Sequence, residues 1–121
     1  MLDLLIRGGH VIDPANNRNK PMDIAIYNGR ITRHEPGEPV RHVIDATGKY
    51  VFPGLIDAHA HMFQDGTEIG ICPDVAYLPT GVTSAIDFSA GVANYPLFRS
   101  SVIARSKVTI KSFLQVCSAT A

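Results

Sequence analysis

Short apolar runs separated by glycine, asparagine and proline make up the first part of the 121-residue chain. Four such runs are arranged in pairs, each pair around a two-residue turn; they occupy residues 3–7, 10–13, 23–27 and 30–33. The turns are Gly8-Gly9 and Asn28-Gly29, whose residues tolerate the positive φ of a tight hairpin. The pattern therefore predicts two β-hairpins joined by a polar loop over residues 14–21.

The pattern continues with two more short strands. A loop over residues 35–39 holds two prolines and a glycine, and strands near 42–46 and 49–52 flank the turn Thr47-Gly48. These elements predict a small β unit over residues 1–52. It contains three scattered histidines, and we interpret them as surface or edge residues because none has a second ligand at useful spacing; they are His10, His34 and His42.

After Pro53-Gly54 the pattern changes to a buried strand that begins at Leu55 and carries polar residues at every second position. Asp57, His59 and His61 are spaced by two, so a regular strand places them on one face. Two imidazoles on one face can bind a single divalent ion at about 2.0–2.1 Å each. Asp57 could hold an imidazole or a neighbouring backbone group in place. A His-x-His pair also arises by chance, so spacing alone leaves both interpretations open.

The last third alternates between helix and strand. We expect a short helix over 73–78, a strand over 81–88, a helix capped by Asn94 that runs through Ile103, and a strand over 108–116. Such alternation is typical of βαβ units with a parallel sheet. Asp87, at the end of a strand, could serve a polar site, but we expect it to cap the following turn.

Composition narrows the class of protein. Apolar residues make up 45% and charged residues 18%, which suits a packed soluble domain, and eleven acidic residues balance eleven basic ones. A net charge of zero gives no sign of the excess of basic residues by which proteins bind nucleic acid or an anionic membrane. Cys72 and Cys117 are expected to be reduced thiols. With no signal peptide and no apolar run of about 18 residues, we expect a cytoplasmic protein.

Two motifs resemble the amidohydrolase superfamily, which includes dihydroorotases, dihydropyrimidinases, allantoinases and ureases. They are Val-Ile-Asp-Ala-Thr-Gly at 43–48 and Pro-Gly-Leu-Ile-Asp-Ala-His-Ala-His at 53–61. The resemblance implies an α/β fold in which a (β/α)8 TIM-type barrel follows a small β-sandwich. It also implies that His59 and His61, at the carboxyl end of the first barrel strand, bind a divalent metal, with Asp57 supporting them.

The resemblance further implies a function. One or two metal ions, zinc by preference, activate water to hydrolyse an amide or ester bond of a small-molecule substrate. The run 78–87, together with residues 111–114, is similar to the dihydroorotase-like deacetylase branch, whose members hydrolyse N- or O-acetylated small molecules.

Chain length conflicts with a complete enzyme of this family, because a (β/α)8 barrel needs about 250 residues. We expect residues 1–52 to be a segment of the β-sandwich and 53–121 to supply about three barrel strands. The resemblance places the remaining ligands and the catalytic base beyond residue 121. The alternative is therefore a catalytically inactive, truncated fragment, which self-associates or pairs with the missing C-terminal part. A self-standing β-plus-α/β binding module is a third interpretation.

Overall fold

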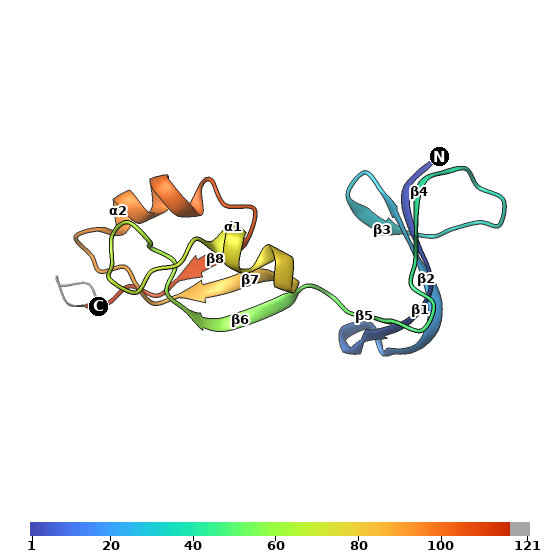
Figure 1. Ribbon diagram of the computed structural model, residues 1–121, viewed down its shortest axis with the longest axis horizontal. Coiled ribbons are helices and arrows are strands. Elements are labelled where there is room, and N and C mark those ends of the chain that lie inside the picture. Colours follow the sequence, from blue (N-terminus) through green and yellow to red (C-terminus); the bar gives the residue numbers. More distant parts are fainter. Residues whose placement is uncertain (117–121) are drawn as a thin grey trace. The chain divides into compact units, whose positions relative to one another are not determined.

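The computed structural model describes residues 1–116, and the chain divides into two compact units (Figure 1). The first unit spans Met1–Pro53, and the second begins at Gly54. Cys117, for which a reduced thiol is expected, lies outside the described residues. Each unit is described by itself.

The first unit is a β-sheet built around one long strand. Its strands are β1 (Leu2–Asp13), β2 (Arg18–Tyr27), β3 (Arg30–Thr32), β4 (Val40–Asp45) and β5 (Tyr50–Val51). The sheet order is β3-β2-β1-β4, and β5 also pairs with β1. Strands β2 and β3 run antiparallel to their neighbours, whereas β4 and β5 lie parallel to β1. The small core consists of Leu2, Leu5 and Ala25, with Val40 packed against it.

The predicted hairpin at Gly8-Gly9 is wrong, because β1 runs straight through both glycines. The register of β1 against β2 shifts between Ile6 and Gly9, and Gly8 has φ +72°, so the glycines form a bulge within the strand. The chain instead reverses over the 3-10 turn η1 (Pro14–Asn16), where Asn17 adopts φ +53°. Strand β2 therefore starts inside the predicted polar loop. The second predicted hairpin is confirmed, with Asn28 and Gly29 both at positive φ between β2 and β3.

The second unit is a parallel sheet with helices on one side (Figure 1). Its strands, in the order β6-β7-β8, are β6 (Leu55–Ala60), β7 (Val82–Asp87) and β8 (Thr109–Ser112). Its helical elements are α1 (Pro73–Ala76), the 3-10 turn η2 (Leu78–Thr80), and α2 (Tyr95–Phe98), which continues as the π-helical segment η3 (Arg99–Ile103). The predicted alternation of strand and helix and the α/β class are confirmed.

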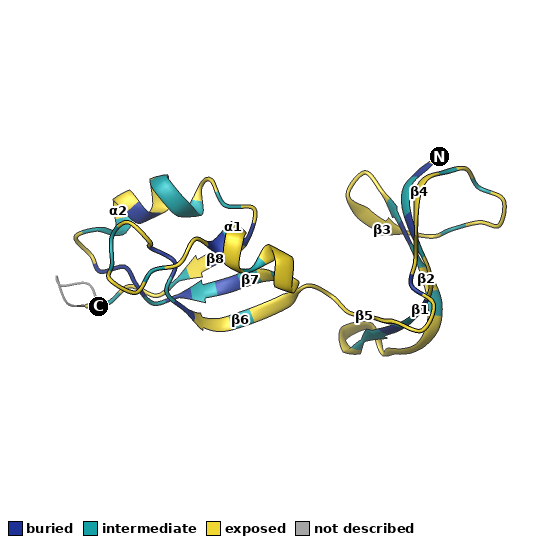
Figure 2. Ribbon diagram, viewed as in Figure 1, coloured by how far each residue is buried: buried dark blue, intermediate teal, exposed yellow. Residues whose placement is uncertain are grey.

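One face of this sheet holds the core, and the other is largely open. Ala60, Ala85 and Ile110 from the three strands pack with Phe63 and Phe98, whose ring centroids lie 5.0 Å apart. Strand β6 is mostly exposed over the rest of its length (Figure 2), and Ile56 is 70% exposed. An apolar side chain this exposed on a strand indicates that this face of the sheet is not packed against another layer.

Two details of the second unit differ from expectation. Asn94 precedes α2, but its side chain makes no cap bond to the helix; its Oδ1 accepts from the N–H of Gly91 instead. Pro96, in the first turn, has no N–H that could donate to a capping side chain. Strand β8 is shorter than predicted, although a single bridge between Gly91 and Gln115 continues the parallel pairing. In the described part of the chain, no helix is long and apolar enough to cross a membrane.

Candidate metal centre

The carboxyl ends of the three parallel strands bring the predicted metal ligands beside residues from β7 and β8. Ala60 pairs with Asp87, and Asp87 pairs with Ser112, so the residues that follow these positions share one edge of the sheet. His59 and His61 lie at this edge, as do Phe88 and Phe113. Binding groups commonly gather at the carboxyl edge of a parallel sheet.

The two imidazoles lie next to each other. Their ring centroids are 5.6 Å apart, and their planes are inclined by 46°. A tetrahedral ion bound by both rings at the usual distance would place the two centroids about 5 Å apart. The observed spacing of the ring centroids is close to that value.

The half-buried side chain of His61 has a polar atom without a partner. Its Nδ1 is buried, and no described residue forms a hydrogen bond with it. Buried polar atoms are nearly always satisfied in native structures, and an orphaned one calls for an unseen partner such as a water or an ion. The observation fits a metal ion that His59 and His61 would hold.

The side chain of His59 is exposed, but its ring contacts a neighbouring aromatic ring. Its ring is stacked on that of Phe88, with centroids 4.3 Å apart and planes inclined by 22°. Phe88 is in turn stacked on Phe113 at 5.1 Å and 24°. The sequence analysis missed both aromatic residues, since only the pairing of β6, β7 and β8 brings them to the histidines.

Asp57 does not share a face with the two imidazoles. The register of β6 against β7 shifts between Asp57 and Ala60, which breaks the regular alternation of side chains. Asp57 pairs with the buried Ala85, and its Oδ2 accepts a 2.7 Å hydrogen bond from the hydroxyl of Tyr77, which packs against the core. It therefore lies on the helix-covered side.

The carboxylate of Asp57 still acts on the strand that carries His59. Its Oδ1 accepts from the backbone N–H of His59 at 3.0 Å. This bond, followed by that from Tyr77, holds the pKa of Asp57 below its ordinary value. Burial, followed by the bond to Asp57, raises the pKa of Tyr77 to about 12. Asp57 thus contacts the backbone of a candidate ligand and not its imidazole.

The side chain of Asp87 is fully buried, and uncharged groups donate hydrogen bonds to both of its carboxylate oxygens. Its Oδ1 accepts from the N–H of Ser89 at 2.9 Å, which confirms the expected turn cap. Its Oδ2 accepts from the Ser89 hydroxyl and from the N–H of Met62, both at 2.7 Å. The bond to Met62 was not expected from the sequence, because it joins residues 25 positions apart.

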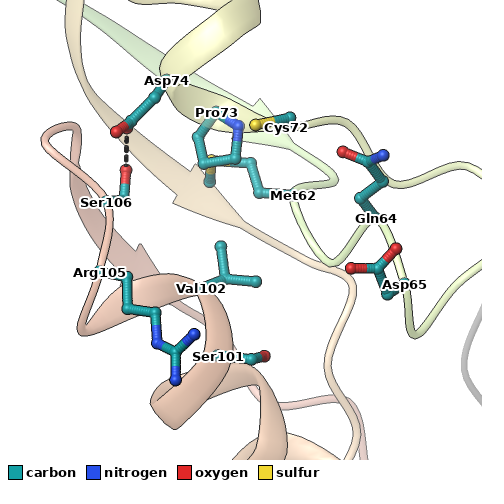
Figure 3. Close-up of a pocket in the computed structure, with 10 residues that line it drawn as sticks. All are labelled: Met62, Gln64, Asp65, Cys72, Pro73, Asp74, Ser101, Val102, Arg105 and Ser106. Atoms are coloured by element: carbon teal, nitrogen blue, oxygen red, sulfur yellow. Dashed lines mark hydrogen bonds between the residues drawn. The ribbon is translucent and has the colours of Figure 1, made fainter.

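A separate pocket of about 210 Å³ lies against η3 and α1 (Figure 3). Its ten lining residues include neither histidine; they are Met62, Gln64, Asp65, Cys72, Pro73, Asp74, Ser101, Val102, Arg105 and Ser106. At its rim, Asp74 accepts from the Ser106 hydroxyl and from the N–H of Lys107. These bonds join α1 to the segment that precedes β8. The pocket is distinct from the histidine pair.

Among the described residues, the two imidazoles have no third candidate metal ligand beside them. Among residues 1–116, no three His, Cys, Asp or Glu side chains lie close enough together to hold an ion. Three protein ligands are usual in a catalytic zinc site. Paired imidazoles at the carboxyl edge of parallel strands are a candidate part of such a site.

Comparison with known sequences defines the family. Residues 42–101 match the profile of the amidohydrolase family. The chain is 46% identical over 69 residues to a dihydroorotase of Acetivibrio thermocellus, covering 54% of this chain and 16% of the relative. It is 42% identical over 74 residues to the deacetylase Atu3266 of Agrobacterium fabrum, covering 60% of this chain and 18% of the relative.

Comparison with solved structures indicates the same family as the sequence comparison. A dihydroorotase crystal structure superimposes with a TM-score of 0.75 at 30% identity, over 94% of this chain and 31% of the other. An N-acyl-D-glutamate deacylase of Bordetella bronchiseptica, solved with zinc and a phosphonate inhibitor, gives 0.59 at 34% identity, over 75% of this chain and 19% of the other. The chain belongs to the amidohydrolase family, and it spans less than a third of the length of these relatives.

Proposed function

We propose that this chain is part of a metal-dependent hydrolase that cleaves amide or ester bonds in small molecules. Membership of the amidohydrolase family supports the reaction class. The single observation that carries the metal is the pair of imidazoles, 5.6 Å apart, with the buried Nδ1 of His61 lacking a partner. A metal held there would supply an activated water for attack on the substrate carbonyl.

The proposal includes the architecture. Strands β6, β7 and β8 would be the first three strands of a (β/α)8 barrel, and residues 1–52 a segment of a β-sandwich. The parallel order β6-β7-β8, with helices on one face and an exposed Ile56 on the other, supports this arrangement. In a barrel the open face would become the packed interior.

Within this mechanism the chain's own residues orient the metal ligands. His59 and His61 would present ring nitrogens to the ion, and Asp57 fixes the backbone of His59 through its N–H. Tyr77 donates to the other oxygen of Asp57, so the carboxylate is held from two sides. Supporting groups of this kind restrict the orientation of the backbone segment that carries a metal ligand.

The finer proposal is a zinc-dependent deacetylase that acts in the cytoplasm. A deacetylase and a zinc-containing deacylase among the similar proteins support the chemistry, and dihydroorotases support cyclic amides as the competing substrate class. The two-donor set favours the alternative for the isolated chain, namely an inactive fragment that self-associates or pairs with the rest of the enzyme.

A zinc titration tests the histidine pair. We expect the 121-residue chain to bind about one Zn²⁺, and both His59→Ala and His61→Ala to weaken binding at least about tenfold, because each removes a direct ligand. His42→Ala, in the first unit, is the matched control and should bind as the parent does. Equal affinity in all four proteins would remove the assignment. Calorimetry on the purified chains makes the measurement.

A further inference from the structure

The end of β7 lies beside the segment that carries both histidines, of which His59 is in β6 and His61 directly follows it. The ring of Phe88 stacks on the imidazole of His59. The two ring centroids lie 4.3 Å apart, and the ring planes are inclined by only 22°. The nitrogen lone pairs of an imidazole lie in the plane of the ring. A flat neighbour that fixes this plane therefore fixes the direction in which His59 can bind an ion.

Phe88 is itself held in place. Its ring stacks on Phe113 with centroids 5.1 Å apart, so three rings follow one another across the ends of β6, β7 and β8. The backbone carbonyl of Phe88 also accepts a 2.6 Å hydrogen bond from the side-chain amide of Gln115. The ring that faces His59 is thus supported from the strand beyond it.

The backbone around His61 is fixed by the same short segment. The N–H of Phe88 donates to the carbonyl of Ala60, and Asp87 accepts from the N–H of Met62. These bonds, at 2.9 and 2.7 Å, hold the residues immediately before and after His61. The carbonyl of His61 accepts from the N–H of Ile71, so a third backbone hydrogen bond holds this segment.

The burial of Asp87 also indicates a role in holding the backbone next to His61. A fully buried carboxylate is costly unless its oxygens are satisfied, and a purely structural core position would favour an apolar residue. One of its two oxygens is directed at the N–H that follows His61. The carboxylate therefore does more than cap its own turn.

We propose that Asp87 and Phe88 are positioning residues for the candidate metal centre. Phe88 fixes the imidazole plane of His59, and Asp87 fixes the backbone that carries His61. The proposal rests on the metal-binding role given above to the two histidines. It adds two residues at the end of a different strand, which act through the histidines and their backbone and not as ligands of the ion.

The experiment combines NMR of the metal-free chain with zinc titration. A stacked ring shields its neighbour, so Phe88→Leu should move the ring protons of His59 downfield, towards their free values. Phe88→Tyr, which keeps the ring, should leave them unchanged. Asp87→Asn should move the amide proton of Met62 and the ring protons of His61. Phe88→Leu and Asp87→Asn should each weaken Zn²⁺ binding about tenfold, as is usual for partners that orient ligands.

Two controls separate positioning from general loss of stability. Phe98→Leu removes the same atoms from the core without touching a histidine, and Ser89→Ala removes one donor to Asp87 but leaves the Met62 bond. Neither should weaken Zn²⁺ binding or move the histidine ring protons. Equal effects of controls and test variants would overturn the proposal, as would unchanged histidine spectra in Phe88→Leu and Asp87→Asn.

The two readouts also distinguish this proposal from the one on which it rests. If the parent chain binds no Zn²⁺, the proposed function of the histidines fails, and the spectra of the metal-free variants still decide whether the imidazoles are held by Phe88 and Asp87. If the parent binds Zn²⁺ and the spectra of the variants match the parent, the positioning proposal alone is wrong.

Discussion

At the scale of single residues, hydrogen bonds and burial set the pKa values of three ionisable groups in the second unit. Tyr77 donates to Asp57, and Asp74 accepts from Ser106 and from the backbone of Lys107. The pKa of each carboxyl is lowered by these bonds, and the pKa of Tyr77 is raised. Each shift therefore makes folding depend on pH.

Tyr77 gives the first prediction. Its pKa rises from 10.0 to about 12 in the folded chain, so the neutral hydroxyl stabilises the fold below pH 10 and that contribution disappears as the pH climbs towards 12. In an absorbance titration of tyrosinate, one of the four tyrosines should ionise late. Tyr77→Phe should abolish this late step, whereas Tyr27→Phe should preserve it. Persistence of the late step in Tyr77→Phe would contradict the assignment.

Asp74 gives the second prediction, on the acid side. Hydrogen bonds from the Ser106 hydroxyl and then from Lys107 lower its pKa below 3.8. A carboxyl whose pKa is lower in the folded state stabilises the fold above the unfolded value, and the effect is lost as the pH falls through the folded value. Asp74→Asn should therefore lower Tm at neutral pH and flatten the fall of Tm below about pH 4. Asp65→Asn, nearby without these bonds, is the control for thermal melts across this range.

At the scale of elements, agreement between sequence and structure depends on how local the deciding interaction is. The hairpin at Asn28-Gly29 was predictable, since both residues adopt the positive φ that their types tolerate. The hairpin at Gly8-Gly9 was not, because one long partner, β2, pairs with both halves of β1 and makes the glycines a bulge. The conformation of a turn is determined by residues that are adjacent in the sequence. The continuity of a strand depends instead on a partner strand that is distant in the sequence.

The same distinction applies to the candidate metal centre. The spacing of His59 and His61 was visible in the sequence and they lie together, but the regular alternation predicted for Asp57 fails at the register shift in β6. Phe88 and the Met62 contact of Asp87 carry no local signal, because parallel pairing with β7 brings them to the histidines.

Gly9 gives a prediction for the first sheet. A Cβ at this position would lie 2.5 Å from Cγ2 of Val51, so close approach of β5 to β1 requires the glycine. Gly9→Ala should destabilise the first unit by about 1–3 kcal/mol, the usual cost of overpacking. The double variant Gly9→Ala, Val51→Ala should recover part of that loss, which urea unfolding of the four chains of the cycle measures. Strict additivity of the two single changes would rule out this contact as the cause.

At the scale of the whole molecule, the second unit presents a sheet with one unpacked face. Ile56 and Phe113 are 70% and 59% exposed, whereas residues on the other face reach near-complete burial. A surface of this kind favours association. The chain should therefore self-associate with rising concentration, and Ile56→Lys should reduce association. Val75→Lys, equally exposed on α1, is the control in sedimentation velocity. Equal effects of the two changes would show that the open face is not responsible.

The mixed pairing around β1 has a consequence for the order of folding. β1, β2 and β3 are joined by short turns, whereas β4 and β5 lie parallel to β1 and reach it only across longer stretches of chain. Closing the longer connections costs more chain entropy, so the three-stranded meander should form first and the parallel edge should join last. By the same reasoning the edge should open first under native conditions. Amide protons of β4 should then exchange with solvent faster than those in the paired centre of β1 and β2.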